Sequence, residues 1–170
     1  MSNMDEKDIM ILDILQKDSR TPLKEIGEHV RLAAPTVHER IQTMLRNGVI
    51  RGFTMVVDPK KLDLDITAFI MLYFKTGGSL GDEKVVELIN SISDIQECFH
   101  LAGDEDLIVK VKTKNMVTLE EIIFRLSKSG QFSRTKSIIA LSTVKENAGV
   151  NLSHVMERMV RQREEKEKSS

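Results

Sequence analysis

The chain has 170 residues, 41% hydrophobic and 30% charged, which fits one large or two small globular domains. Its net charge is −1, so affinity for nucleic acid would have to arise from local clustering of cations. Cys98 is the single cysteine, which excludes an internal disulfide and suits a cytoplasmic protein, and we expect neither a secretory signal nor a membrane span.

The N-terminal third predicts three helices, at about residues 5–17, 22–30 and 34–47, from apolar residues at helical spacing. The third helix has the apolar stripe Val37, Ile41, Met44 and Leu45, and Gly48 is suited to end it. The period then changes to two, and "VIRGFTMVVD" predicts a pair of short strands. Residues 1–57 are therefore predicted to form a winged helix-turn-helix domain.

The remainder alternates strands and helices in a different order. Residues 58–65 are polar and are the predicted linker, followed by a domain at 66–145. Its strands are expected at 66–75, 94–102, 106–113 and 131–145, with helices at 82–92 and 116–129. The order βαββαβ predicts a ferredoxin-like fold, and the whole chain an α+β protein. Because both helices would cover one sheet face, the other face most simply packs on a second copy.

The C-terminal residues 146–170 combine an apolar stripe with a charged end. Leu152, Val155, Met156, Met159 and Val160 recur at helical spacing before "RQREEKEKSS". We predict a short amphipathic helix followed by a charged tail.

Four stretches in this order resemble the Lrp/AsnC (feast–famine) family of transcriptional regulators. They are "LDILQKDSRTPLKEIGEHV", "APTVHERIQTMLRNGVIRGFTMVVDP", "HLAGDEDLIVKV" and "SRTKSIIAL". The resemblance implies a regulator that binds double-stranded DNA, forms a homodimer that assembles into a tetramer or octamer, and responds to an amino acid or related metabolite bound between C-terminal domains. The family usually has Gly-Leu-Ser before the recognition helix, where this chain has Arg31-Leu32-Ala33.

The third helix and its surroundings supply candidate DNA contacts. Opposite its apolar stripe lie short polar side chains and cations, the types that reach base edges and phosphates in a major groove. Residues 17–51 contain seven cationic side chains and four anionic ones, so this segment is locally positive, whereas the whole chain is slightly acidic. The candidates are Arg31, Thr36, His38, Glu39, Arg40, Thr43, Arg46 and Arg51. Each cation could instead be an ordinary solvent-exposed side chain without a role in DNA binding. His38 is equally compatible with a packing or surface position.

The segment "AGDEDL" and the last strand supply candidate effector contacts. Carboxylates suit an ammonium group, hydroxyls suit a carboxylate, and glycine permits close approach. In the family this loop and the last strand border the effector cleft, and the matching positions are Gly103, Asp104, Asp106, Thr135 and Ser137. The alternative is an acidic β-turn without ligand.

The predicted function is a sequence-specific DNA-binding transcriptional regulator without catalytic residues, metal or cofactor. His29, His38, His100 and His154 lack metal-site spacing. Two alternatives stay open on the same two-domain scaffold: a haem-pathway decarboxylase-like enzyme, in which His100 would act, and a metabolite-binding module without DNA binding.

Overall fold

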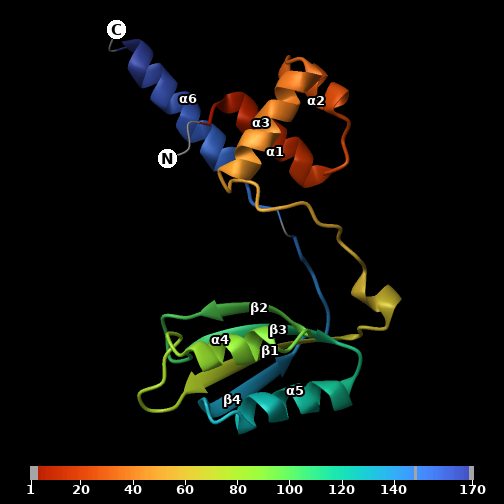
Figure 1. The fold of residues 1–170 in the computed structure, drawn as a ribbon, viewed down its shortest axis with the longest axis vertical. Coiled ribbons are helices and arrows are strands. Elements are labelled where there is room, and N and C mark those ends of the chain that lie inside the picture. The colour runs from red at the N-terminus through yellow and green to blue at the C-terminus, as the bar shows by residue number, and fades with distance from the viewer. Residues whose placement is uncertain (1–3, 148, 169–170) are drawn as a thin grey trace. The chain divides into compact units, whose positions relative to one another are not determined.

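The computed structural model describes residues 4–147 and 149–168, with side chains as far as residue 162 (Figure 1). Contacts divide the chain into two compact units. The first contains Met1–Met55 together with Glu146–Ser170, and the second contains Val56–Lys145. The chain thus leaves the first unit and returns to it after completing the second.

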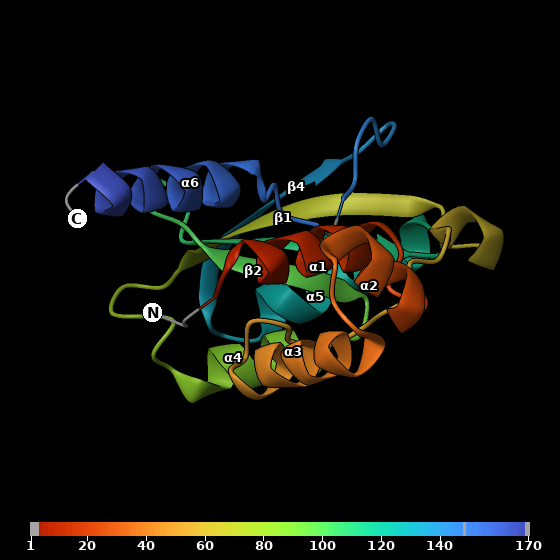
Figure 2. The same ribbon diagram turned by 90° about the horizontal axis from the view of Figure 1, so that it is seen from above.

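Three helices form the first unit's core: α1 (Glu6–Lys17), α2 (Leu23–Val30) and α3 (Ala34–Arg46) (Figure 2). A capping box starts α1, because the Asp5 carboxylate accepts from the Asp8 backbone N–H and the Asp8 carboxylate accepts from the Asp5 N–H. One apolar cluster joins the helices, with buried members Ile11, Leu15, Ile26, Val30, Val37, Ile41 and Met44. The three predicted helices are confirmed.

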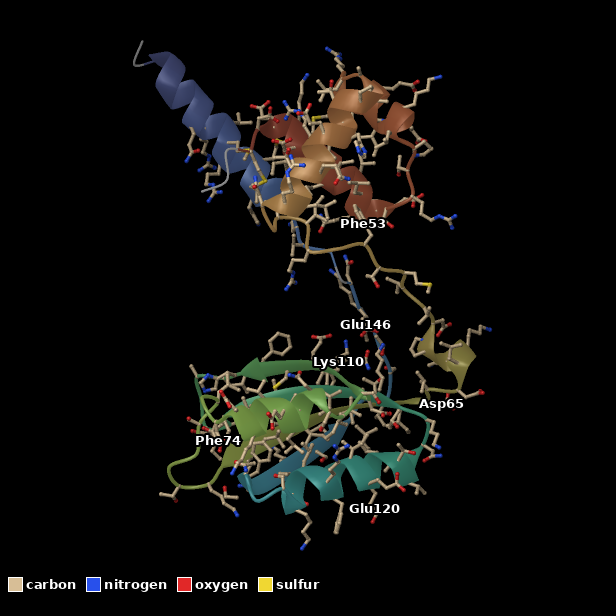
Figure 3. The ribbon with its side chains drawn as sticks, in the orientation of Figure 1. Phe53, Asp65, Phe74, Lys110, Glu120 and Glu146 are labelled. Carbon is tan, nitrogen blue, oxygen red and sulfur yellow. The ribbon has the colours of Figure 1, made fainter. Side chains whose placement is uncertain are left out.

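The strand pair predicted after the third helix is wrong for this single chain. Residues 47–65 contain no strand, and only a short 3-10 helix, η1 (Pro59–Leu62), interrupts the irregular backbone. Phe53, labelled in Figure 3, lies on this segment and is 52% exposed, and Met55, Val56 and Val57 are exposed too. An isolated two-stranded hairpin is marginal in water, and within the described residues no third strand or helix covers these side chains.

The second unit has the predicted βαββαβ order. Its elements are β1 (Ile66–Phe74), α4 (Glu83–Asn90), β2 (Ile95–His100), β3 (Leu107–Thr113), α5 (Met116–Lys128) and β4 (Phe132–Ile139). The strands form one sheet in the order β2-β3-β1-β4, with every neighbouring pair antiparallel. The ferredoxin-like prediction is confirmed by this element order and strand order, in which β1 and β3, the strands with the longest apolar alternation, are central.

Strand alternation decides which sheet face is covered. Ala68, Ile70 and Leu72 of β1 are fully buried and share a cluster with residues of both α4 and α5, so both helices lie on that face. The intervening residues of β1 face the other way. On this second face Phe99 is 55% exposed and Ile138 is 46% exposed. The second unit therefore has one packed face and one open apolar face.

The last helix, α6 (Ser153–Lys168), belongs to the first unit and contacts α1. The Gln16 side chain joins the two segments, since its Nε2 donates to Val150 O at 3.2 Å and its Oε1 accepts from Val150 N at 2.7 Å. The helix is longer than predicted and continues through the charged stretch expected to be a tail. Residues 169 and 170 lie outside the described residues.

Candidate nucleic-acid interface and effector site

The turn between α2 and α3 is tight, and two residues account for it. Arg31 ends α2 in the left-handed conformation, with φ 55° and ψ 55°, and its cap N–H bonds to Gly27 O. A Cβ on Gly27 would lie 2.5 Å from the carbonyl oxygen of Leu32, so only glycine fits there. Ala33 precedes α3 and supplies no side-chain cap, whereas serine there would stabilise the helix by about 1 kcal/mol.

Burial fixes the outward face of α3. Val37, Ile41 and Met44 are buried against α1 and α2, so the opposite side of the helix faces solvent. Most of the predicted DNA contacts on α3 are exposed, namely His38, Glu39, Thr43 and Arg46, while Thr36 is half-buried. Arg46 Nη2 donates to Thr43 Oγ1 at 2.9 Å, so these two side chains form one polar group near the C-terminal end of the helix. Arg31 and Arg51, outside the helix, are also exposed.

Arg40 differs from the other candidate arginines, because its guanidinium is held by α1. Its Nη1 donates to Asp5 Oδ2 and to Asp8 Oδ1, both at 2.8 Å, and its side chain is 29% exposed. The hydrogen bond to Asp8 raises the pKa of Arg40. The pKa of Asp5 lies below its ordinary value. Partial burial acts to raise this pKa, but the hydrogen bonds from the Asp8 N–H and from Arg40 stabilise the carboxylate and have the larger combined effect. Arg40 thus joins α3 to the capping box of α1, a link the sequence analysis missed.

The predicted effector residues lie on two segments at one end of the sheet. Gly103, Asp104 and Asp106 are on the β2–β3 loop, and Leu107 after them pairs with Leu72, which pairs with Thr135. With strands about 4.8 Å apart, Thr135 is roughly 10 Å from this loop, across β1. Ser137 pairs with Ile70, one pleat further along the strand. Both hydroxyl residues oppose buried residues and so share the helix-covered face.

The loop residues are not equivalent. Asp106 accepts the Phe74 backbone N–H at 2.7 Å, and its own N–H donates to Leu72 O, so it binds the loop to the end of β1. Gly103 has a negative φ, and nothing lies within 4 Å of where its Cβ would be. Neither backbone strain nor packing within this chain therefore requires glycine at 103.

A further cluster at this end was missed by the sequence analysis. Tyr73 donates its hydroxyl to Glu105 Oε1 at 3.1 Å, and the Arg134 guanidinium lies 5.0 Å from the Tyr73 ring centroid. The one usable signal was that Tyr73 is the only tyrosine of the chain and stands in an otherwise apolar strand.

The described residues contain no cluster of three or more His, Cys, Asp or Glu arranged to hold a metal ion. Cys98 is on the edge strand β2, where the residue as a whole is exposed but partial desolvation of its thiol raises the pKa. Within the part of the chain that is described, no helix is long and apolar enough to cross a membrane.

Comparison with known proteins agrees with this two-unit architecture. The AsnC-type helix-turn-helix domain matches residues 4–45, and the Lrp/AsnC ligand binding domain matches residues 67–150. The HTH-type transcriptional regulator FL11 of Pyrococcus abyssi is 36% identical over 147 residues, covering 85% of this chain and 93% of the relative. The chain belongs to the Lrp/AsnC family of transcriptional regulators.

Solved structures of similar proteins share the fold. A transcriptional regulator from Neisseria meningitidis, solved as a complex with L-Met, superposes with a TM-score of 0.83 at 22% identity, covering 89% of this chain and 99% of that one. LrpC of Bacillus subtilis gives a TM-score of 0.74 at 25% identity, with 85% and 99% covered. The predicted α+β architecture is confirmed.

Membership of the Lrp/AsnC family decides between the functions left open by the sequence. The chain is a DNA-binding transcriptional regulator that carries a ligand-binding domain. The prediction of a regulator is confirmed, and the enzyme alternative is set aside because the chain matches both domains of these regulators along with a relative named as a transcriptional regulator.

Proposed function

We propose that this Lrp/AsnC regulator places two copies of α3 in successive major grooves of its operator and that a bound amino acid or related metabolite modulates this binding. In this proposal residues 1–57 bind DNA, 58–65 link the domains, 66–145 bind the effector and the second copy, and 146–170 form the appended helix and its charged end. The orientation of α3 carries the proposal, since its apolar face is buried and its polar face is free.

The DNA contacts divide by chemistry. Thr36, His38, Glu39 and Thr43 have the short polar groups that read base edges, and Arg31, Arg46 and Arg51 have cations for phosphates. Arg40 is instead assigned to positioning, because two carboxylates already occupy its guanidinium. Losing a base-reading side chain should cost specificity, whereas losing a phosphate contact should weaken binding to all sequences alike.

Homodimer formation is supported by the open face of the sheet. The register places Phe99, Ile108 and Met71 in one cross-strand row that ends at Lys136, and Phe69 and Ile138 in the next, beside Lys110. This apolar patch crosses all four strands opposite the helices, and exposed patches of that kind mark protein interfaces. A second copy would cover it and bring a second α3 to the DNA, since dimers read half-sites about one helical turn apart. Dimers are proposed to assemble further into a tetramer or octamer.

An amino-acid effector is supported by the relative from Neisseria meningitidis, which was solved with L-Met. In this chain Gly103 leaves open space beside its backbone, and no hydrogen bond or ion pair of the Asp104 carboxylate is seen among the described residues. An ammonium group could therefore meet Asp104, with Thr135 and Ser137 as hydroxyl donors and Asp106 holding the loop.

The decisive experiment measures fluorescence anisotropy of a duplex from upstream of the chain's own gene, at two salt concentrations, with and without each amino acid. We expect salt-sensitive binding tighter than to a scrambled duplex, weakened by Arg46→Ala but not by Lys60→Ala in η1. Equal affinity for both duplexes would overturn the proposed DNA-reading face. An unchanged affinity with every amino acid would overturn the proposed amino-acid effector.

A further inference from the structure

Helix α6 lies outside the family pattern. The match to the ligand binding domain ends at residue 150, and α6 begins at Ser153. The alignment with the Pyrococcus abyssi relative covers 93% of that protein but 85% of this chain. Any site formed by α6 therefore lies outside the two matched family domains.

Helix α6 lines a solvent-open pocket of about 910 Å³ together with α1 and α2, entirely within the first unit. Pockets for small ligands typically measure roughly 300–1,000 Å³. Two apolar stripes line this pocket: Ile9, Met10 and Ile14 of α1, and Leu152, just before α6, with Met156 and Val160 of α6. The two hydrogen bonds between Gln16 and Val150 hold the start of α6 beside the end of α1. Apolar side chains of α1 and of the segment around α6 thus line one pocket at the α1–α6 junction.

The polar lining of the cavity is acidic. Four carboxylates contribute to it against two cations, and they are Asp13, Asp18, Glu25 and Glu157 against Lys17 and Arg161. Lys17 is already paired with Asp13 at 2.6 Å. The Glu25 carboxylate has no hydrogen bond or ion pair within residues 4–147 and 149–162, although the Glu25 backbone oxygen contacts His29 Nδ1 at 2.8 Å. A negative rim beside an apolar interior favours a ligand with a cationic head.

We propose that the cavity between α1, α2 and α6 binds a free single-chain amphiphile, with its apolar body between the two apolar stripes and its ammonium head beside Glu25. Binding would stabilise the packing of α6 on the helix-turn-helix. Because Glu25 is on α2, which packs directly on α3, the ligand would act on the DNA-binding unit itself and not through the ligand binding domain.

Decylammonium is the probe for this site, and decyl sulfate of equal chain length is its control. Isothermal titration calorimetry with the full-length chain, below the micelle concentration of either compound, measures affinity and stoichiometry. We expect saturable binding of one decylammonium per chain, about tenfold tighter than decyl sulfate, and a rise in the melting temperature with ligand concentration. Equal affinity for the two head groups, or titration without saturation, would overturn the proposal.

Two matched pairs of variants locate the binding. Met156→Trp fills the cavity, whereas Met159→Trp places the same group on α6 away from the lining. Glu25→Gln removes the proposed head-group partner, whereas Glu28→Gln removes a carboxylate of α2 that does not line the cavity. Only the first member of each pair should lose decylammonium affinity. Equal losses within the pairs would identify general adsorption and overturn the proposal, and circular dichroism of each variant excludes unfolding as the cause.

Discussion

The guanidinium of Arg40 in α3 donates to the carboxylate of Asp8 in α1 at 2.8 Å, where the Asp8 side chain is 11% exposed. The Asp8 carboxylate also accepts a hydrogen bond from the Asp5 backbone N–H. It therefore completes the capping box of α1 and also holds α3, the proposed DNA-binding helix. The stability of α1 and the placement of α3 therefore depend on the same side chain.

Asp8→Ala should lower the free energy of unfolding of the first unit by about 1–3 kcal/mol, because it leaves Arg40 and the Asp5 N–H without this partner. Urea denaturation followed by circular dichroism measures the change. Asp13→Ala is the control on the same helix, since its exposed pair with Lys17 should contribute about 0.5 kcal/mol or less. Equal losses in the two variants would contradict the proposed link.

Gly27→Ala should destabilise the helix-turn-helix by about 1–3 kcal/mol, because its Cβ would lie 2.5 Å from the Leu32 carbonyl oxygen. Thermal unfolding of the variant checks this expectation. Gly103→Ala, where nothing lies within 4 Å, should leave the melting temperature nearly unchanged. A Gly27→Ala variant as stable as the wild type would mean that the turn relaxes without cost.

Arg31→Gly should change stability and DNA affinity in opposite directions. Glycine removes the strain of a non-glycine residue at φ 55° and should stabilise the protein by up to about 1 kcal/mol. Loss of the cation should weaken DNA binding and reduce its salt dependence. Arg31→Ala separates the two effects, since it should lose affinity without gaining stability. If DNA affinity is unchanged in both variants, Arg31 does not contact phosphate.

The contribution of Asp5 should depend on pH. Its pKa in the folded state lies below the ordinary value of 3.8, so its stabilisation is present above that value and is lost as pH falls through the lower folded-state pKa. Asp5→Asn keeps an N-cap residue but cannot carry the charge that pairs with Arg40. The wild type should therefore melt above this variant at neutral pH, and the difference should vanish in strong acid. A difference that persists there would exclude the ion pair as its origin.

Asp104 and Asp106 should behave differently although they are two residues apart. Asp106→Ala leaves the Phe74 N–H without its acceptor and should destabilise the second unit by about 1–3 kcal/mol. Asp104→Ala should leave stability unchanged but abolish the thermal stabilisation by the amino-acid effector. An Asp104→Ala variant that still responds fully would assign the ammonium contact elsewhere.

Local sequence determined most elements of this protein. The stripe of Val37, Ile41 and Met44 predicted which face of α3 is buried, and alternation in 107–113 predicted β3, because helices and strands repeat with different periods. The order of these elements was enough to predict the fold and, with the family resemblance, the regulator. Periodicity failed at residues 49–58, because a strand needs a partner for its backbone groups and the described part of the chain offers none there.

Only the tertiary structure decided how individual side chains are used. Sequence spacing grouped Arg40 with Arg46, but contact with α1, 32 residues away along the chain, engages one guanidinium and leaves the other facing solvent. Asp104 and Asp106 are equivalent in the sequence pattern, but in the described fold only Asp106 accepts a backbone N–H from the end of β1. The packing of α6 on α1 could not be predicted from the sequence either. Its amphipathic pattern indicates a packed face but does not identify the element on which that face packs. Periodicity is encoded in neighbours along the chain, whereas ion pairs and cavities depend on residues that folding brings together.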